Sequence, residues 1–557
     1  MTSSGHADLV LTGAAVYTQD TRRPRAEAVA ISDGRIAAVG SDEEIRSWIG
    51  PRTEVRPLDG RMVIPSFQDA HIHPLIGGLE MLRCDLTGLT QREQYLSAVA
   101  RYAADHPAAS WITGGGWMMA AFPGGTPLAA DLDTLLPDRP AFLLNRDHHG
   151  AWVNSRALEL AGITTATLDP ADGRIERDAS GRPTGVLHEG AMHLVEKLIP
   201  APGLDEQVQA LLAAQRRLHA FGITAWQDAL VGAYAGSPDP IPAYQALISR
   251  GLLTARVRGC LWWRRDQGVG QIDDLLHIRA TAGPGLALDA VKIMQDGVCE
   301  NFTAATLTPY LDRHGHPTDN RGISFFDPAE LTETVTRLHG TGLQVHFHTI
   351  GERAVREVLD AVEAALVHHG RCDLRHHLAH IQIVHPHDLP RFAALDVGAT
   401  MQPLWAYHDD QMTDLTLPFL GEERGRWQYP FAALEQYGTR LAMGSDWPVS
   451  SPDPILGLHV AANRTTYNPG ADPAHDAHRP FLPEQRLTLA SALRAATAGS
   501  AYVNHLDQVT GTIERGKDAD LAILDHDLFS LPTEDIYTAS VLTTIARGVV
   551  VHDTSRQ

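Results

Sequence analysis

Cysteine is scarce in this chain, and long apolar runs are absent. The 557 residues include four cysteines, and no two of them form a CxxC pair. Such widely spaced thiols indicate neither a disulfide framework nor a zinc ribbon. No stretch reaches about 18 consecutive apolar residues, so we expect no membrane-spanning helix. The start "MTSSGHADLVLTGAAVY" has no basic segment and no long apolar core, so we expect no signal peptide and a cytoplasmic location.

Positive charge is also in deficit. The chain has 46 Lys and Arg against 67 Asp and Glu, a formal net charge of −21. Nucleic-acid phosphates would be repelled by this balance, which argues against a nucleic-acid partner. The 44% hydrophobic content is normal for a globular protein with a large core. Histidine is abundant instead, with 29 residues, and it is both a common metal ligand and a proton carrier near neutral pH.

Both ends of the chain have a β-rich pattern. Residues 7–63 alternate apolar and polar residues between "TG" and "DG" breaks, and "GTIERGKDADLAILD" and "VLTTIARGVVVHD" repeat that pattern near the C-terminus. Chain termini often lie close together. We therefore predict one small composite β-sandwich domain from residues 1–63 and 505–557.

The middle of the chain alternates short apolar runs with helix-like segments. One such segment, 351–370, places an apolar face at helical spacing and ends at Gly370. The pattern predicts an α/β fold, a TIM-like (β/α)₈ barrel over 64–504. Its eight expected strands are 62–73, 222–229, 255–263, 288–297, 343–349, 374–382, 397–403 and 440–448. The gap between the first two is too long for one crossover, so we predict that 74–221 is a large insertion after barrel strand 1, forming a lobe over the barrel mouth.

Several expected strands end in residues that bind metals. Barrel enzymes carry their active sites at the carboxyl ends of the strands, and residues i and i+2 of one strand face the same side. Imidazoles and carboxylates are ligands that zinc accepts. A buried lysine within an apolar strand is costly unless it is neutralised or paired. The residues concerned are His71, His73, Lys292, His346, His348, His380 and Asp446.

Each of these residues also has a structural interpretation. An isolated HxH pair can arise by chance, Asp446 could cap a turn, and one of His346 and His348 could be a packed ring. Asp69 shares the side of the pleat that carries His71 and His73 but lies deeper, so we interpret it as support for His71 rather than as a ligand. The joint pattern at five of eight strand ends favours a metal site.

The motifs resemble those of a known family. "PSFQDAHIHP" is similar to the strand-one signature of the metal-dependent amidohydrolase superfamily. "VKIMQDGVCENFTAA", "QVHFHTIGERAV", "RHHLAHIQIVHP" and "LAMGSDWPVS" resemble amidohydrolase family 3, the branch that contains N-substituted formamide deformylases. "LLNRDHHGAWVNSRAL" in the insertion and "GTIERGKDADLAILD" near the end resemble this branch too, so the resemblance covers nearly the whole chain.

The resemblance implies a centre with two divalent ions, for which zinc is the first expectation. His71 and His73 would bind one ion, and His348 and His380 the other. Lys292, carbamylated by carbon dioxide, would bridge them. A buried neutral amine can form a carbamate, which two cations would stabilise.

Further roles follow from the resemblance. Asp446 would be both a ligand and the proton acceptor for an activated water. His149 would hold the carbonyl oxygen or the substrate tail, with a core histidine as the alternative. Trp117 and Tyr310 are expected as walls of an apolar substrate pocket, with plain packing as the alternative.

The sequence departs from the family pattern at two positions. His148 stands where a glycine is expected before the family histidine, and Ala379 stands where a glutamate often precedes the strand-six histidine. Neither position is an expected ligand. Both are expected to alter the fit of the substrate.

These observations predict a metal-dependent hydrolase of non-peptide C–N bonds that acts on a small N-acyl or N-formyl amide. A deaminase or cyclic-amide hydrolase on the same scaffold is one alternative. A non-catalytic binding protein that retains the fold is another. A homodimer is expected from the resemblance alone.

Overall fold

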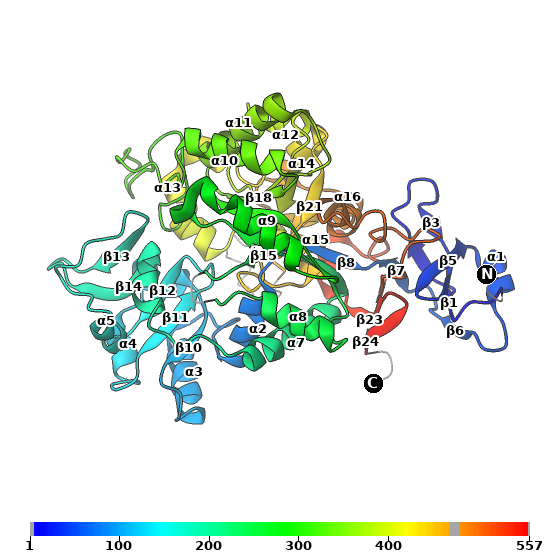
Figure 1. The fold of residues 1–557 in the computed structure, drawn as a ribbon, viewed down its shortest axis with the longest axis horizontal. Helices are drawn as coiled ribbons and strands as arrows, with labels where there is room; N and C mark the ends of the chain where they lie inside the picture. The colour runs from blue at the N-terminus through cyan, green and yellow to red at the C-terminus, as the bar shows by residue number, and fades with distance from the viewer. Residues whose placement is uncertain (1–4, 235–236, 468–477, 555–557) are drawn as a thin grey trace.

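The computed structural model describes residues 5–234, 237–467 and 478–554, with a barrel between two sets of sheets (Figure 1). Eight strands form one parallel sheet in the order β21-β20-β19-β18-β17-β16-β15-β8. Its ends approach each other where Asp446 N–H donates to the carbonyl of His71 at 2.8 Å. The predicted TIM-like barrel is therefore confirmed. The strands are β8 (Phe67–Ile72), β15 (Ile223–Val231), β16 (Arg256–Trp262), β17 (Leu286–Met294), β18 (Gln344–Thr349), β19 (His377–His380), β20 (Gly398–Met401) and β21 (Leu441–Met443).

The first expected strand, 62–73, is two strands. β7 (Met62–Pro65) pairs with strands of a terminal sheet, and after Ser66 the chain continues directly into β8 of the barrel. Both halves are buried throughout, so the apolar pattern does not change where the chain passes from one sheet to the other. The sequence alone therefore gives no break at Ser66.

The barrel strands are buried on both faces, as parallel strands covered by helices must be. Every residue of β15 and β18 is buried. The expected helix is α11 (Glu352–His369), followed by Gly370 at φ 81°. Its buried side includes Val355, Val358 and Val362, while Leu366 is partly buried against the same core.

Strands from both ends of the chain share one six-stranded sheet. Its order is β24-β23-β22-β7-β2-β3, and it packs on a four-stranded sheet in the order β5-β4-β1-β6 through a common apolar core that includes Leu11, Ile31 and Ile523. The N-terminal strands are β1 (Leu9–Thr12), β2 (Ala15–Tyr17), β3 (Arg25–Ala26), β4 (Ala28–Ser32), β5 (Arg35–Gly40) and β6 (Glu54–Pro57), and the C-terminal ones are β22 (Leu521–Leu524), β23 (Val541–Ala546) and β24 (Val549–Asp553).

The long insertion contributes a second six-stranded sheet, on the side of the barrel opposite the terminal sheets (Figure 1). Two helices of the inserted segment, α2 (Pro74–Leu82) and α7 (Leu204–Ala220), pack together against the barrel core instead. They meet so closely at Gly78 that a Cβ there would lie 2.1 Å from the Ala210 carbonyl oxygen. The sheet is built from β9 (Cys84–Asp85), β10 (Ile112–Trp117), β11 (Ala141–Asn145), β12 (Gly150–Val153), β13 (Gly173–Arg177) and β14 (Pro183–Glu189).

Among the described residues, no helix has both the length and the apolar character needed to cross a bilayer.

Candidate metal centre

A cavity of about 220 Å³ lies where the carboxyl ends of the barrel strands face the inserted sheet. Barrel residues form its floor, and the inserted segment supplies the opposite wall. The lining includes all six expected metal ligands and His149 from the insertion. The floor residues are His71, His73, Lys292, His348, His380 and Asp446.

Three of these side chains converge on one point. Asp446 Oδ1 lies 3.2 Å from His71 Nε2 and 3.0 Å from His73 Nε2. Their ligand atoms all lie within 4.8 Å of one another, and no other group of three or more His, Cys, Asp or Glu in the described residues does so. His71, His73 and Asp446 thus form a group that could hold a metal ion.

Local structure fixes this group. His71 is in β8, and His73 directly precedes α2, whose Pro74 starts the helix. The carboxylate of Asp69 accepts the backbone N–H groups of His71 at 3.0 Å and Ser445 at 3.1 Å. Asp69 thus links the segment that carries His71 to the segment that carries Asp446, as expected of a supporting residue.

Lys292 reaches the centre from β17. Its Nζ lies 3.4 Å from His71 Nδ1 and 3.5 Å from Nε2, and the residue is 4% exposed. Burial lowers the pKa of Lys292 to about 8, which increases its neutral fraction near pH 7. A neutral amine is the form that reacts with carbon dioxide.

The two histidines of β18 have different places. His346 is fully buried below the cavity, where its Nε2 lies 2.7 Å from His71 Nδ1 and its Nδ1 lies 2.8 Å from Gln227 Oε1. His348 lines the cavity, and its ring centre lies 4.4 Å from that of His380. Of this pair, His348 is therefore the one available to an ion in the cavity.

His380, another of the six expected metal ligands, lies at the end of β19. Its Nδ1 lies 3.7 Å from Asp446 Oδ2, and its ring stacks on Trp405 with centres 5.2 Å apart. The stacking fixes the ring plane of His380.

The pKa shifts favour the protonation states in which these side chains can bind a metal ion. Burial lowers the pKa of His71 to about 3 and holds the pKa values of His348 and His380 well below 6.5. Burial alone would raise the pKa of Asp446, but the charge and hydrogen bonding of His71 and His73 hold that pKa well below its usual value. Neutral imidazoles beside an ionised carboxylate are what a divalent cation binds.

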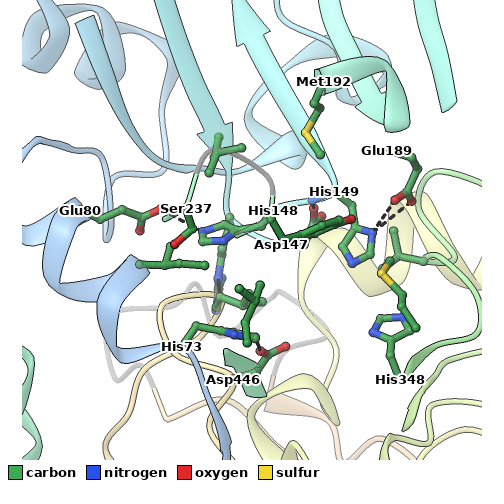
Figure 2. Close-up of a pocket in the computed structure, with 18 of the residues that line it drawn as sticks. His73, Glu80, Asp147, His148, His149, Glu189, Met192, Ser237, His348 and Asp446 are labelled. Atoms are coloured by element: carbon green, nitrogen blue, oxygen red, sulfur yellow. Dashed lines mark hydrogen bonds and ion pairs between the residues drawn. The ribbon is translucent and has the colours of Figure 1, made fainter. Parts of the chain in front are cut away.

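His149 faces the floor from the inserted sheet (Figure 2). Its Nδ1 lies 3.0 Å from both carboxylate oxygens of Glu189, and its ring centre lies 5.5 Å from that of His348. Glu189 also accepts the Thr303 hydroxyl at 2.8 Å and is 6% exposed. Burial opposes charge on His149, but Glu189 outweighs it and raises the pKa of His149 to about 9. His149 is therefore a cationic hydrogen-bond donor at neutral pH.

Glu189→Gln should shift the alkaline limb of the pH–kcat/KM profile to lower pH. The wild-type limb is expected near pH 9, where His149 loses its proton as pH rises. Without the carboxylate, burial dominates and lowers the pKa of His149. A pH series of kcat/KM between pH 6 and about 10 measures both limbs.

Glu176→Gln is the matched control, because Glu176 makes the same kind of contact with His188, at 3.0 Å, and neither residue lines the cavity. It should leave the limb in place. An unmoved limb in Glu189→Gln would remove His149 from the reaction as a proton-bearing group.

His148 is turned away from His149, toward the insertion helix α2 (Figure 2). Its Nε2 lies 3.0 Å from Glu80 Oε1, and both residues line the cavity. Its φ is 64°, in the left-handed region where glycine is the easiest residue. This explains why glycine is expected there, and it places an imidazole–carboxylate pair on the cavity wall.

The two expected aromatic walls lie elsewhere. Trp117 is fully buried in the apolar core of the insertion, where its indole donates to the Leu143 carbonyl at 2.8 Å. Tyr310 is 1% exposed in a separate core cluster and donates to the Ala304 carbonyl at 2.8 Å. Neither residue is part of the cavity lining. These positions agree with the alternative interpretation, in which both side chains pack in an apolar core.

Three residues that sequence reasoning missed help to build this site: Glu80, Glu189 and Trp405. Glu189 lies beside His149 because β12 and β14 are antiparallel neighbours with Gly150 opposite His188. The structure shows this register, and the sequence alone does not. Glu80 and Trp405 likewise meet their partners only through the tertiary fold.

The chain is similar to known proteins over nearly its whole length. The sequence profile of the amidohydrolase family matches residues 54–552. The chain is 32% identical over 548 residues to protein LONG AFTER FAR-RED 3 of Arabidopsis thaliana, covering 97% of this chain and 91% of that protein. It is 28% identical over 558 residues to the N-substituted formamide deformylase of Arthrobacter pascens, covering 98% of each.

A solved structure shares the whole architecture. The crystal structure of an uncharacterised metal-dependent hydrolase from Pyrococcus furiosus superposes with a TM-score of 0.69 at 26% identity, covering 93% of this chain and 99% of that one. The family profile spans the barrel and parts of both terminal segments. The chain therefore belongs to the amidohydrolase family, in its family 3 branch, and is a metal-dependent hydrolase.

Proposed function

We propose that this protein hydrolyses the C–N bond of a small non-peptide amide, an N-acyl or N-formyl amine. The observation that carries the proposal is the cavity itself, with an ionised carboxylate and neutral imidazoles on its floor and a cationic imidazole, His149, facing them. The similarity to N-substituted formamide deformylase over 98% of both chains supports the same bond type.

The donor set fits a divalent cation. Asp446 Oδ1 lies 3.2 Å from His71 Nε2 and 3.0 Å from His73 Nε2, and His73 Nδ1 and His380 Nδ1 are buried without a hydrogen-bond partner among the described residues. We propose two divalent ions, zinc being the first to test. His71 and His73 would hold one, His348 and His380 the other, with Asp446 as a further ligand and Lys292 as a carbamate bridge. Bound ions would supply a water of lowered pKa and polarise the carbonyl.

Side chains of this protein would carry out the remaining steps. Asp446 would accept the proton of the attacking water and deliver it to the leaving nitrogen. His149, held by Glu189, would donate a hydrogen bond to the carbonyl oxygen as negative charge develops on it. Leu144 and Met192 of the insertion line the apolar part of the cavity and would exclude bulk water.

The test is a substrate panel on the metal-loaded protein. We expect turnover of N-substituted formamides or acetamides, with formate or acetate and the free amine released in equal amounts. Ammonia release from aminated heterocycles with no amide turnover would replace the proposal with a deaminase. Opening of cyclic amides alone would replace it with a cyclic-amide hydrolase. No bound metal and no turnover would leave a binding protein.

A further inference from the structure

A row of hydrogen-bonded side chains crosses the barrel interior below the metal centre. Gln344, His346 and His348 occupy alternate positions of β18, so they face the same side of the strand. His348 lines the cavity, whereas Gln344 and His346 are buried below it. Gln227 of β15 meets both of these buried residues, although β16 and β17 separate β15 from β18 in the sheet. The row therefore connects opposite sides of the barrel.

Gln344 fixes the direction of the first hydrogen bond in this row. Its Nε2 lies 2.7 Å from the carbonyl oxygen of Arg375 and 2.9 Å from that of Val503. Carbonyl oxygens only accept, so the amide nitrogen of Gln344 must face them and donate one hydrogen to each. The other end of the amide is therefore its oxygen, which accepts Gln227 Nε2 at 2.8 Å.

Gln227 passes this direction on to His346. Because Gln227 Nε2 donates to Gln344, its oxygen is the atom that faces His346 Nδ1, 2.8 Å away. An amide oxygen carries no hydrogen, so His346 Nδ1 must carry one and donate it. Cys260 Sγ lies 3.4 Å from the same nitrogen and is a weak second partner.

The other ring nitrogen of His346, Nε2, has no hydrogen. The ring is fully buried, and among the described residues no carboxylate forms an ion pair with it. A buried charge without an opposite charge is strongly unfavourable. Burial, and then the charges of His377 and Lys292, hold the pKa of His346 well below its usual value. A neutral imidazole with its hydrogen on Nδ1 has a lone pair on Nε2.

This lone pair determines which nitrogen of His71 is free. His346 Nε2 lies 2.7 Å from His71 Nδ1, and two bare nitrogens would repel each other at this distance. His71 Nδ1 must therefore carry a hydrogen and donate it. Lys292 Nζ lies 3.4 Å from His71 Nδ1 and 3.5 Å from Nε2, so it favours neither nitrogen. The free nitrogen is Nε2, the one that lies 3.2 Å from Asp446 Oδ1.

We propose that His346 is a positioning residue of the metal centre. The backbone carbonyls that hold Gln344 act through Gln227 and keep the hydrogen of His346 on Nδ1. His346 in turn keeps the hydrogen of His71 on Nδ1 and leaves the lone pair of His71 Nε2 for the ion. Ligand histidines usually donate their second nitrogen to a carboxylate, a carbonyl or water. This role rests on the ligation of an ion by His71 proposed above, and it is independent of the reaction assigned to the centre.

The wild-type protein provides the first test. Two-bond ¹H–¹⁵N correlation spectra of protein labelled with ¹⁵N in histidine show which ring nitrogens carry a hydrogen. We expect a hydrogen on Nδ1 of both His71 and His346, and a bare Nε2 on His346, before and after zinc is added. The variants His71→Gln and His346→Gln assign the signals by their loss. A hydrogen on His346 Nε2, or a bare Nδ1 on His71, would overturn the proposal.

Zinc affinity, measured by competition with a chelator, tests the consequence for the ion. His346→Leu removes the acceptor for His71, and we expect zinc to bind about 10- to 100-fold more weakly, the usual effect of losing a partner of a ligand histidine. His346→Gln can place an amide oxygen near the position of Nε2, so it should recover most of this loss. Equal zinc affinities in His346→Leu and the wild type would contradict the positioning role.

His219→Leu is the matched control for the loss of a buried imidazole. The two ring nitrogens of His219 lie 2.9 Å from the Ile223 carbonyl oxygen and 2.8 Å from Thr254 Oγ1. The residue is 3% exposed and does not line the cavity. Its loss should cost stability and leave zinc affinity unchanged, which separates an effect on the ion from an effect on folding.

Gln227→Leu acts one step farther from the ion and leaves His346 in place, so it serves if His346→Leu does not fold. Leucine cannot accept a hydrogen bond, so the hydrogen of His346 is free to move to Nε2. We expect the His346 signals to show a mixture of the two neutral forms, and zinc to bind about tenfold more weakly. A hydrogen that stays on Nδ1 in this variant would contradict the control by Gln344.

None of these measurements uses an amide substrate, so they separate this role from the proposed function. The expected hydrogen positions and zinc affinities without any amide turnover would leave the positioning role in place and remove the amide hydrolase. Amide turnover in a protein whose His71 has a bare Nδ1 would do the reverse.

Discussion

Asp446→Asn should lower kcat by about 10²- to 10⁴-fold, the usual contribution of a positioned general base. Asparagine keeps the size and one oxygen of the side chain but cannot accept the proton of the attacking water. The carboxylate is 5% exposed. Burial would raise its pKa, but the charge and hydrogen bonding of His71 and His73 outweigh burial and hold the pKa well below its usual value. It is therefore ionised over the whole working pH range. Steady-state kinetics with the best amide of the panel measures the loss.

Two measurements separate chemistry from folding and metal loss in this variant. Thermal unfolding should be cooperative, and elemental analysis should find at least one ion per chain, since His71, His73, His348 and His380 are intact. Asp274→Asn is the control, because Asp274 is exposed in the first turn of α9 (Ile272–Thr281). If Asp446→Asn kept more than about a tenth of wild-type kcat, Asp446 would not be the proton acceptor.

Lys292→Met should lose bound metal as well as activity. The chain has three lysines, Lys197, Lys292 and Lys517, and only Lys292 touches the centre. Methionine preserves the length and apolar stem of the side chain at this buried position, so folding should survive. Removal of a bridging carbamate would take away a ligand shared by two ions, so we expect metal content to fall by at least one ion per chain.

Elemental analysis and isotope labelling check this bridge. Protein prepared with ¹³C-labelled bicarbonate should show one carbamate carbon by NMR, absent from Lys292→Met and present in Lys197→Ala, where an exposed lysine is removed. Two ions per chain in Lys292→Met, with no labelled carbamate in the wild type, would refute the bridge. Lys292 would then act as a buried amine beside His71.

The barrel could be predicted because its strands are buried on both faces and end in metal-binding residue types. β17 is an apolar run that carries Lys292 near its end, and β18 alternates apolar residues with His346 and His348; both patterns depend on the local sequence alone. The break at Ser66 could not be predicted, because β7 and β8 are both fully buried and differ only in their partner strands. Pairing partners distant in sequence leave no local signal.

The floor of the site was predictable and its walls were not. His71, His73, Lys292, His348, His380 and Asp446 all line one cavity, since strand ends in a barrel must converge. Trp117 was expected at the wall because it is a large aromatic in the insertion, but a sequence does not reveal which face of an inserted sheet is covered. Glu189 depends on the strand register of that sheet, and its φ of 51° is set by tertiary contacts.

The passage from β7 into β8 constrains when the centre can mature. β7 pairs with β22, whose residues are synthesised more than 450 positions after it, and His71 is held through its carbonyl by Asp446. His71 and His73, which we propose as ligands, therefore have no fixed geometry until almost the whole chain has been translated. We expect metal loading to follow synthesis rather than accompany it. Cells that starve for the ion during translation should still yield a protein that can be activated afterwards.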